Sequence, residues 1–132
     1  MNGERNLETL LRTMQPQLTA GKWVFRTSPI GFDSATLDNA ILMFKESEGM
    51  TIIIPATDEE AHVPAWGMIT LSIHSDLAAV GFLAAITTAL AAMDIPVNAV
   101  SAYFHDHIFV PYERREDAME CLRCMMRETH IG

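Results

Sequence analysis

Apolar residues recur every three or four positions in three stretches of the chain, and this spacing predicts three helices. The first covers residues 6–14, with Asn6 as its N-cap and Pro16 beyond its end. The other two cover residues 77–93 and 114–128. A short helical turn is also expected at residues 57–60, so helices occur in both halves of the chain.

Runs of β-branched and aromatic residues between these segments predict strands. The expected strands are residues 22–27, 40–47, 50–55, 66–74, 97–104 and 107–111. Gly49 can supply the tight turn that joins the second and third strands into a hairpin. The last two strands are expected to form a second hairpin that turns near His105 and Asp106. Residues 28–39 carry no periodic pattern that predicts an element.

Both halves contain an apolar strand that is followed by an acidic helix start. Residues 51–55 read Thr-Ile-Ile-Ile-Pro, and residues 108–111 read Ile-Phe-Val-Pro. This weak repeat and the order of the elements predict an α+β fold in which a split β-α-β unit is used twice. We expect an antiparallel sheet with helices on one face.

The chain has the size and composition of a folded module that does not bind nucleic acid. Its 132 residues are 49% hydrophobic and 20% charged, which predicts a core large enough to fold. The net charge of −8 repels phosphate backbones and anionic membranes. No segment resembles a signal peptide or a transmembrane span. We therefore expect a cytoplasmic protein with neither nucleic-acid nor membrane partners.

Cys121 and Cys124 lie three residues apart in the last expected helix. Such a pair can be half of a zinc site or a redox pair. A zinc site needs two more ligands, and a redox pair is favoured at a helix N-terminus. We interpret both residues as reduced thiols that fill the flank of the helix.

One face of the helix expected at residues 77–93 is small and uncharged. Its members are Ala78, Gly81, Ala85, Thr88, Ala89 and Ala92. A solvated helix face would carry Lys and Glu instead. We therefore expect this face to be covered, either by the degenerate half of the same chain or by a second copy in a two-fold homodimer, which is the commonest closure.

Residues 68–124 resemble the ACT domain, especially the regulatory segment of aspartokinases. The resemblance rests on Val80 and Gly81 opening a helix, an Ile-x-Val at residues 95–97, a strand that ends near Ser101, and a hairpin leading to a helix with Ala and Leu. The whole chain is similar to a small stand-alone bacterial family of tandem ACT-like proteins.

The resemblance implies both a fold and a function. It implies two ferredoxin-like halves of the βαββαβ type, a degenerate one at residues 1–64 and a complete one at residues 65–132. It also implies a non-catalytic regulatory module that binds an amino acid or a small carboxylate and acts on a separate partner protein. No cofactor is expected.

The strand-to-helix turn at residues 75–81 is the expected ligand site. A helix N-terminus presents free N–H groups that favour a carboxylate, and Gly81 allows close approach. Asp76 is the nearest acceptor for an ammonium group. The expected ligand-binding residues are Ser75, Asp76, Ala79, Val80, Gly81, Phe82 and Asn98. Alternatively, Gly81 only lets two helices touch, and Ser75 or Asp76 only caps one of them.

In aspartokinase-like segments, an Asn that contacts the ligand occupies the position held here by Pro96. Asn98 follows two residues later and therefore lies on the same strand face. We expect it to take the place of that Asn.

His105 and His107 suggest a different function. Histidines two apart on a strand project to the same side and could share a metal ion, with His74 and His62 as further ligands. The ACT-like domain of the nickel-responsive repressor binds metal through histidines, so a metal sensor is one alternative. The opposing interpretation is a tight turn built by Asp106 with locally bonded histidines. A protein-interaction module without a ligand is a further alternative, and no arrangement typical of an enzyme is recognisable.

Overall fold

The computed structural model describes residues 3–131, which form two compact units. The central unit is formed by residues 21–66. The terminal unit combines the described residues up to Ala20 with those from Gly67 onward, so both ends of the chain contribute to it. This division differs from the expected halves 1–64 and 65–132, because the N-terminal segment packs in the same unit as the C-terminal residues.

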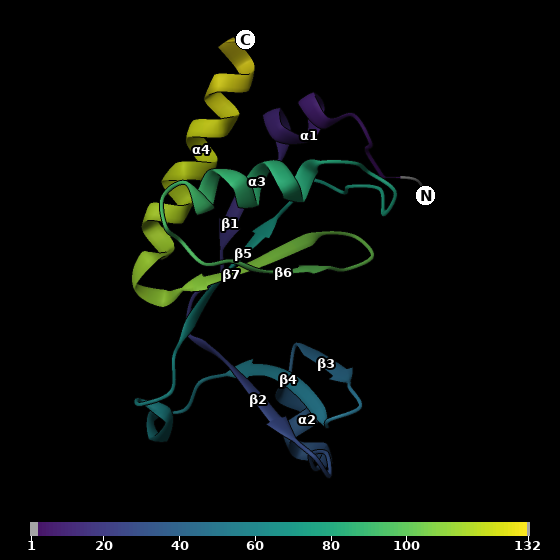
Figure 1. Cartoon of the computed structure of the whole chain (residues 1–132), viewed down its shortest axis with the longest axis vertical. Coiled ribbons are helices and arrows are strands. Elements are labelled where there is room, and N and C mark those ends of the chain that lie inside the picture. The colour runs from purple at the N-terminus through teal and green to yellow at the C-terminus, as the bar shows by residue number, and fades with distance from the viewer. Residues whose placement is uncertain (1–2, 132) are drawn as a thin grey trace. The chain divides into compact units, whose positions relative to one another are not determined.

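The terminal unit contains a sheet with the strand order β1-β5-β7-β6, shown in Figure 1. The strands are β1 (Pro16–Leu18), β5 (Trp66–Leu71), β6 (Asn98–Ser101) and β7 (Asp106–Pro111). β1 runs antiparallel to β5, with Pro16 opposite Leu71, and β6 runs antiparallel to β7. A βαββαβ fold has its last strand at the end of the chain, whereas here β1 supplies the equivalent strand from the beginning. The ferredoxin-like prediction is confirmed with this change of chain order.

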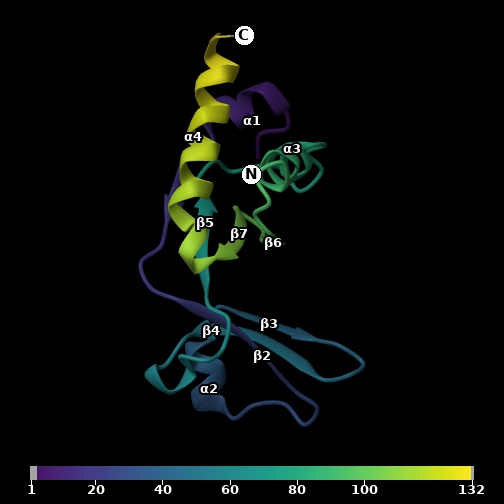
Figure 2. The same cartoon turned by 60° about the vertical axis from the view of Figure 1, so that its left-hand side comes forward.

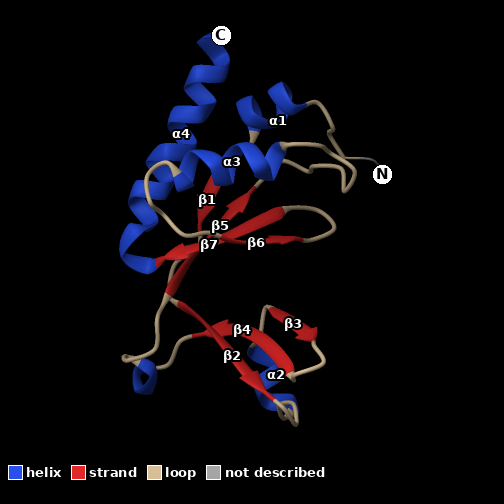
Figure 3. Ribbon diagram, in the orientation of Figure 1, coloured by secondary structure: helices blue, strands red, loops and turns tan. Residues whose placement is uncertain are grey.

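Three helices lie on one side of this sheet, as Figures 1 and 3 show. They are α1 (Leu7–Thr13), α3 (Phe82–Ala91) and α4 (Arg115–Ile131), and a 3-10 turn η2 (Tyr112–Arg114) precedes α4. Asn6 caps α1 as predicted, because its side chain accepts a hydrogen bond of 2.9 Å from the Thr9 N–H. Within residues 3–131, we find no helix with the length and apolar character needed to cross a bilayer.

The core of the terminal unit lies between the helices and the sheet. Its fully buried members come from every helix and from the inward face of the strands: Leu10, Met14, Ile69, Leu71, Ile86, Leu90, Ile108, Val110, Ala118 and Leu122. Figure 2 shows α4 upright beside the strands of this unit, and α4 contacts β1 and β7. The predicted alternation along β5 is confirmed, since Ile69 and Leu71 are buried while Met68 and Thr70 are not.

The central unit is a smaller sheet in the order β3-β4-β2, with α2 against it. Its elements are β2 (Trp23–Ser28), α2 (Ser34–Asn39), β3 (Leu42–Lys45), β4 (Met50–Pro55) and η1 (Asp58–Glu60). Val24, Ile52 and Ile54 form its core together with Leu37 of α2. Trp66 pairs with Trp23 beside β2.

The observed elements differ from the expected ones in several places. α3 begins at Phe82 rather than at residue 77, because Gly81 has a left-handed φ of +89°. The second hairpin turns at residues 102–105, so Asp106 begins β7 instead of forming the turn. β1 and α2 were not expected. β1 has only three residues, and α2 has six residues and begins after the N-cap Asp33 in the segment without periodicity.

Candidate ligand pocket

The connection between β5 and α3 is held by its own hydrogen bonds. The Ala78 N–H donates to Asp76 Oδ1 at 2.7 Å, and the Ala79 N–H donates to the Asp76 carbonyl at 2.9 Å. These bonds form an Asx-type turn, which Asp and Asn favour. The Ala79 N–H is therefore occupied within the turn, whereas the expected role of Ala79 was to contact the ligand.

The N-terminal segment holds this connection in place through hydrogen bonds and an ion pair. The Glu4 N–H donates to the His74 carbonyl, and the Glu4 carbonyl accepts from the Asp76 N–H, both at 2.8 Å. Arg5 Nε lies 3.3 Å from Asp76 Oδ1. The hydrogen bond from Ala78 lowers the pKa of Asp76, burial opposes this shift, and Arg5 lowers that pKa further. Asp76 therefore stays ionised, but its carboxylate already serves the turn.

The first turn of α3 has no side-chain cap. Gly81 stands at the N-cap position, and its left-handed backbone directs the chain into the helix. An α-helix leaves its first N–H groups without intrahelical partners, and these groups carry the positive end of the helix dipole. The N-terminal end of α3 can therefore accept a negatively charged group.

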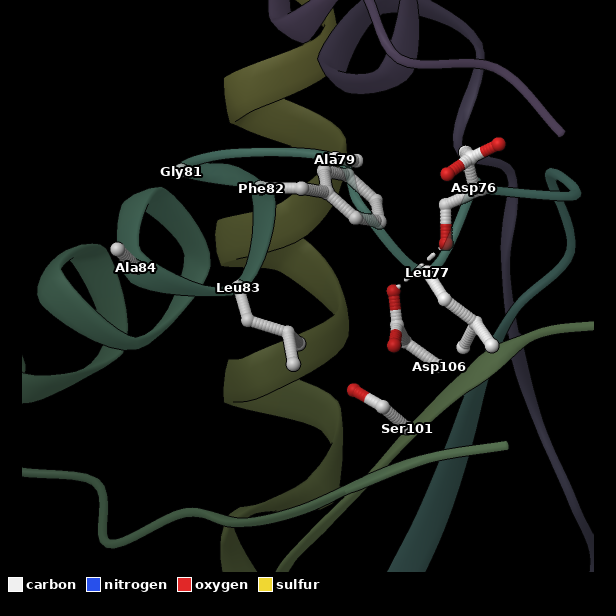
Figure 4. Close-up of a pocket in the computed structure, with 10 residues that line it drawn as sticks. Asp76, Leu77, Ala79, Gly81, Phe82, Leu83, Ala84, Ser101 and Asp106 are labelled. Carbon is white, nitrogen blue, oxygen red and sulfur yellow. Dashed lines mark hydrogen bonds between the residues drawn. The ribbon is translucent and has the colours of Figure 1, made fainter. Parts of the chain in front are cut away.

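A buried carboxylate lies opposite this helix end. Asp106 and Ser75 are each only 7% exposed, and Ser75 Oγ donates a hydrogen bond of 3.0 Å to Asp106 Oδ2. Ser101 of β6 pairs in register with Asp106. Figure 4 shows the side chains of Ser101, Asp106 and Leu83 pointing toward the same space. A desolvated carboxylate is stabilised by a cationic partner, so this group suits an ammonium.

These residues enclose a cavity of about 140 Å³. It is lined by the β5–α3 connection, the start of α3, Ser101 and Asp106. An apolar cavity of about 150 Å³ is large enough for benzene, so this one suits a molecule of about six heavy atoms. The pocket thus combines a negative group and a positive helix end around a small volume.

Most of the expected ligand-binding residues line this cavity. They are Ser75, Asp76, Ala79, Gly81 and Phe82. Val80 does not line it and is 82% exposed. Asn98 is exposed at the edge of the sheet, where it pairs with Phe109, and it does not line the cavity either.

Sequence reasoning missed Asp106 as a pocket residue because it placed this residue in the turn. A signal for the correct placement was present, since Asp106 precedes Ile108 and Val110 by two and four residues. Alternate residues on a strand share a face, and both isoleucine and valine here are buried on the helix side. The expected turn near His105 and Asp106 lies later than the observed turn at residues 102–105, so it removes Asp106 from the strand that Ile108 and Val110 share.

The histidines that suggested a metal site make other contacts. His107 Nδ1 lies 2.9 Å from Thr70 Oγ1, and the ring centroids of His105 and His107 are 6.3 Å apart. Burial lowers the pKa of His107, His105 adds to this shift, and Asp106 opposes it. Among the described residues, no group of three or more His, Cys, Asp or Glu side chains is placed to hold a metal ion.

The terminal unit is ferredoxin-like and has a small polar pocket at its strand-to-helix connection. Two family models for the ACT domain match this chain, one over residues 66–124 and the other over residues 2–64. The chain therefore belongs to the ACT domain family, and the resemblance noted in the sequence is confirmed. ACT domains are regulatory and non-catalytic, bind small molecules such as amino acids, and often dimerise.

Two solved structures share the fold. A protein of unknown function from Vibrio cholerae, described as a possible transport protein, is 41% identical, with a TM-score of 0.75, and the match covers 88% of this chain and 92% of that one. Atu0741 from Agobacterium tumefaciens is 15% identical, with a TM-score of 0.64 over 84% and 87% of the two chains. No curated protein matches the chain.

Proposed function

We propose that this protein is a non-catalytic module that binds an amino acid or a small carboxylate beside α3 and signals its occupancy to a separate partner protein. The observation that carries this proposal is the buried Asp106–Ser75 pair, which faces the uncapped start of α3 across a small cavity. An α-amino acid carries an ammonium and a carboxylate a few ångströms apart. The two ends of the pocket are complementary to these two charges.

The proposed contacts follow from this polarity. The ligand carboxylate accepts hydrogen bonds from the N–H groups at the start of α3. The ligand ammonium donates to Asp106, and the Ser75 hydroxyl keeps that carboxylate in place. Asp76 shapes the turn, and Phe82 bounds the apolar side. A free ammonium is needed for full affinity, so we expect an amino acid to bind more tightly than the corresponding deaminated acid.

Calorimetry against a panel of amino acids and small carboxylates tests the proposal. Removing one charged hydrogen-bond partner costs about 1.5–3 kcal/mol, so Asp106→Asn should weaken binding roughly tenfold or more. Ser75→Ala should weaken it less, because it removes only the group that positions the carboxylate. Asn98→Ala is the matched control, since Asn98 lies outside the cavity. Equal affinities for all four proteins would contradict this site, and melting temperatures would establish that each variant is folded.

We further propose that the outer face of α3 forms a homodimer. Ala84, Thr88 and Ala91 are exposed on this helix and carry no charge. A two-fold axis is the commonest way to cover such a face. Light scattering should then give twice the chain mass of 14.7 kDa, and Thr88→Arg should reduce it to the monomer mass. A monomer at micromolar concentration would overturn this part of the proposal.

The cytoplasm is the compartment in which we propose that this module acts. Cys121 and Cys124 are free thiols rather than a disulfide. Reduced cysteines are typical of compartments in which glutathione and thioredoxin keep thiols reduced. Fractionation of cells followed by detection of the protein tests this location.

A further inference from the structure

A groove between α3 and α4 collects four sulfur atoms. It has a volume of about 520 Å³ and lies apart from the pocket that Asp106 lines. Its sulfur-bearing lining residues are Met93, Cys121, Cys124 and Met125. Asp117, Glu120 and Glu128 also line it. Cys121 and Met125 also pack against the core of the terminal unit, and none of the four residues lines the proposed ligand pocket.

The two cysteines are placed to act together. They stand three residues apart on α4, and side chains at this spacing lie on one helix face with Cβ atoms about 5–6 Å apart. Both thiols are half-buried and neither is in a disulfide. Cys124 Sγ donates a hydrogen bond of 3.4 Å to Glu128 Oε1. Two sulfur atoms can therefore converge on one ion in the groove without unwinding the helix.

The chemistry of this set favours a soft metal. Thiolate and thioether ligands select Cu(I), zinc and iron–sulfur clusters, whereas carboxylates select harder ions. A structural zinc site is tetrahedral and closed by four ligands. Among the described residues, no third His, Cys, Asp or Glu joins the two cysteines in a group that could hold a metal ion. Two thiolates with nearby thioethers match the low coordination number that Cu(I) accepts, but not the needs of Zn(II).

Two of the three carboxylates that line the groove are already paired with arginines. Glu120 is paired with Arg127 at 2.8 Å, and Asp117 is paired with Arg114 at 2.9 Å. Arg127 also interacts with Cys124, and Glu128 Oε1 accepts the hydrogen bond of the Cys124 thiol. A metal bound by Cys124 thus replaces the proton that this hydrogen bond now holds.

We propose that the groove between α3 and α4 binds one Cu(I) ion through the thiolates of Cys121 and Cys124, with a thioether of Met93 or Met125 as a third ligand. Each thiol releases its proton to solvent as its sulfur–copper bond forms. The copper stays in the +1 state, so no oxidant or reductant takes part. This proposal is independent of the ligand pocket.

An anaerobic titration of the full chain with Cu(I) against the chelator bathocuproine disulfonate tests the proposal. We expect one copper per chain to leave the chelator. Cys121→Ser and Cys124→Ser should each weaken binding at least about tenfold, because even the loss of an outer-shell partner of a metal ligand typically costs about that much. Met93→Leu and Met125→Leu should each weaken it by a smaller factor. Met43→Leu is the control, because Met43 lies on β3 in the central unit.

Three results would overturn the proposal. The wild-type chain could leave all copper with the chelator, the double Cys→Ser variant could compete as well as the wild type, or Zn(II) could bind as tightly as Cu(I). Circular dichroism and thermal melting of each variant without metal establish that a lost affinity does not reflect a lost fold. Serine is close in size to cysteine, so the groove keeps its shape in these variants.

Discussion

Gly31 and Gly81 adopt the same left-handed backbone conformation, with φ of +87° and +89°. Each follows an exposed aliphatic residue and precedes a phenylalanine. The preceding residues, Ile30 and Val80, are 95% and 82% exposed. One glycine lies before α2 in the central unit, and the other lies before α3 in the terminal unit. The two ACT domain matches thus share a turn as well as an order of elements.

Replacing either glycine should destabilise its unit through the backbone alone. A Cβ at position 31 would meet only Met50 Cε at 4.0 Å, and one at position 81 would meet Leu7 Cδ2 at 3.6 Å, which are ordinary contacts. The left-handed conformation costs about 1–2 kcal/mol for an L-residue. The free energy of unfolding of Gly31→Ala and of Gly81→Ala should therefore be lower by about that amount. Asn tolerates this conformation, so the Gly→Asn variants at the same positions should be destabilised less than the Gly→Ala variants. Urea unfolding measures both, and equal losses for Ala and Asn would refute backbone strain as the cause.

Gly3 should be intolerant of a side chain for the opposite reason. A Cβ there would lie 2.6 Å from Asp76 N and from the Ser75 carbonyl carbon, closer than such atoms approach. Gly3→Ala should therefore shift the β5–α3 connection and lower both the melting temperature and the affinity of the pocket. Overpacking of this kind costs about 1–3 kcal/mol. The exposed Glu8→Ala is the control, and a Gly3→Ala protein that matches it in both measurements would contradict the bracing role of the N-terminal segment.

The Arg26–Glu60 ion pair should make the central unit sensitive to acid. Arg26 Nε donates to Glu60 Oε2 at 2.8 Å, and this bond lowers the pKa of Glu60 to about 2. Because the folded pKa lies below the ordinary value of 4.5, the contribution is present above pH 4.5 and is lost as the pH falls toward 2. With solvent screening it amounts to on the order of 1 kcal/mol. The free energy of unfolding, measured from pH 6 to about 2, should fall less steeply with decreasing pH in Glu60→Gln than in the wild type.

His107 should weaken the fold in mild acid. Burial lowers the pKa of His107 below 6.5, so the unfolded chain binds this proton more readily than the folded chain. Stability should then rise with pH through the window just below 6.5 and level off above it. His107→Gln should flatten this part of the curve, which unfolding in urea at a series of pH values measures. An unchanged slope would show that other groups cause the dependence.

Cys121 should react slowly with alkylating reagents. Burial raises the pKa of the Cys121 thiol, and Cys124 and Glu128 add to this shift. The thiolate is the reactive form, so iodoacetamide at pH 8 should modify Cys121 more slowly in the folded protein than in urea. Mass spectrometry of the modified peptides measures both rates. Equal rates in the folded and unfolded chains would show that Cys121 is not protected.

Elements set by neighbouring residues could be predicted from the sequence. The Asn6 cap of α1, the apolar run of β4 and the periodic stripe of α4 depend on residues a few positions apart. Their bounds in the structure lie close to the expected ones. The candidate pocket was also found in part, because a strand-to-helix turn with a glycine before the helix is a local pattern.

Tertiary contacts decided what the local pattern did not contain. β1 has three residues and exists because Leu71 and Ile69 of β5 pair with it from more than fifty positions away. Asp106 lines the pocket because the hairpin turns at residues 102–105 and leaves Asp106 in β7. Its hydrogen-bond partner Ser75 lies 31 positions earlier in the chain. A short strand and a buried carboxylate are each unfavourable alone, since their hydrogen bonds must come from elsewhere. The sequence by itself therefore determined α1, α4, the body of α3, the longer strands and the family, whereas the tertiary structure determined which distant groups satisfy the buried polar atoms.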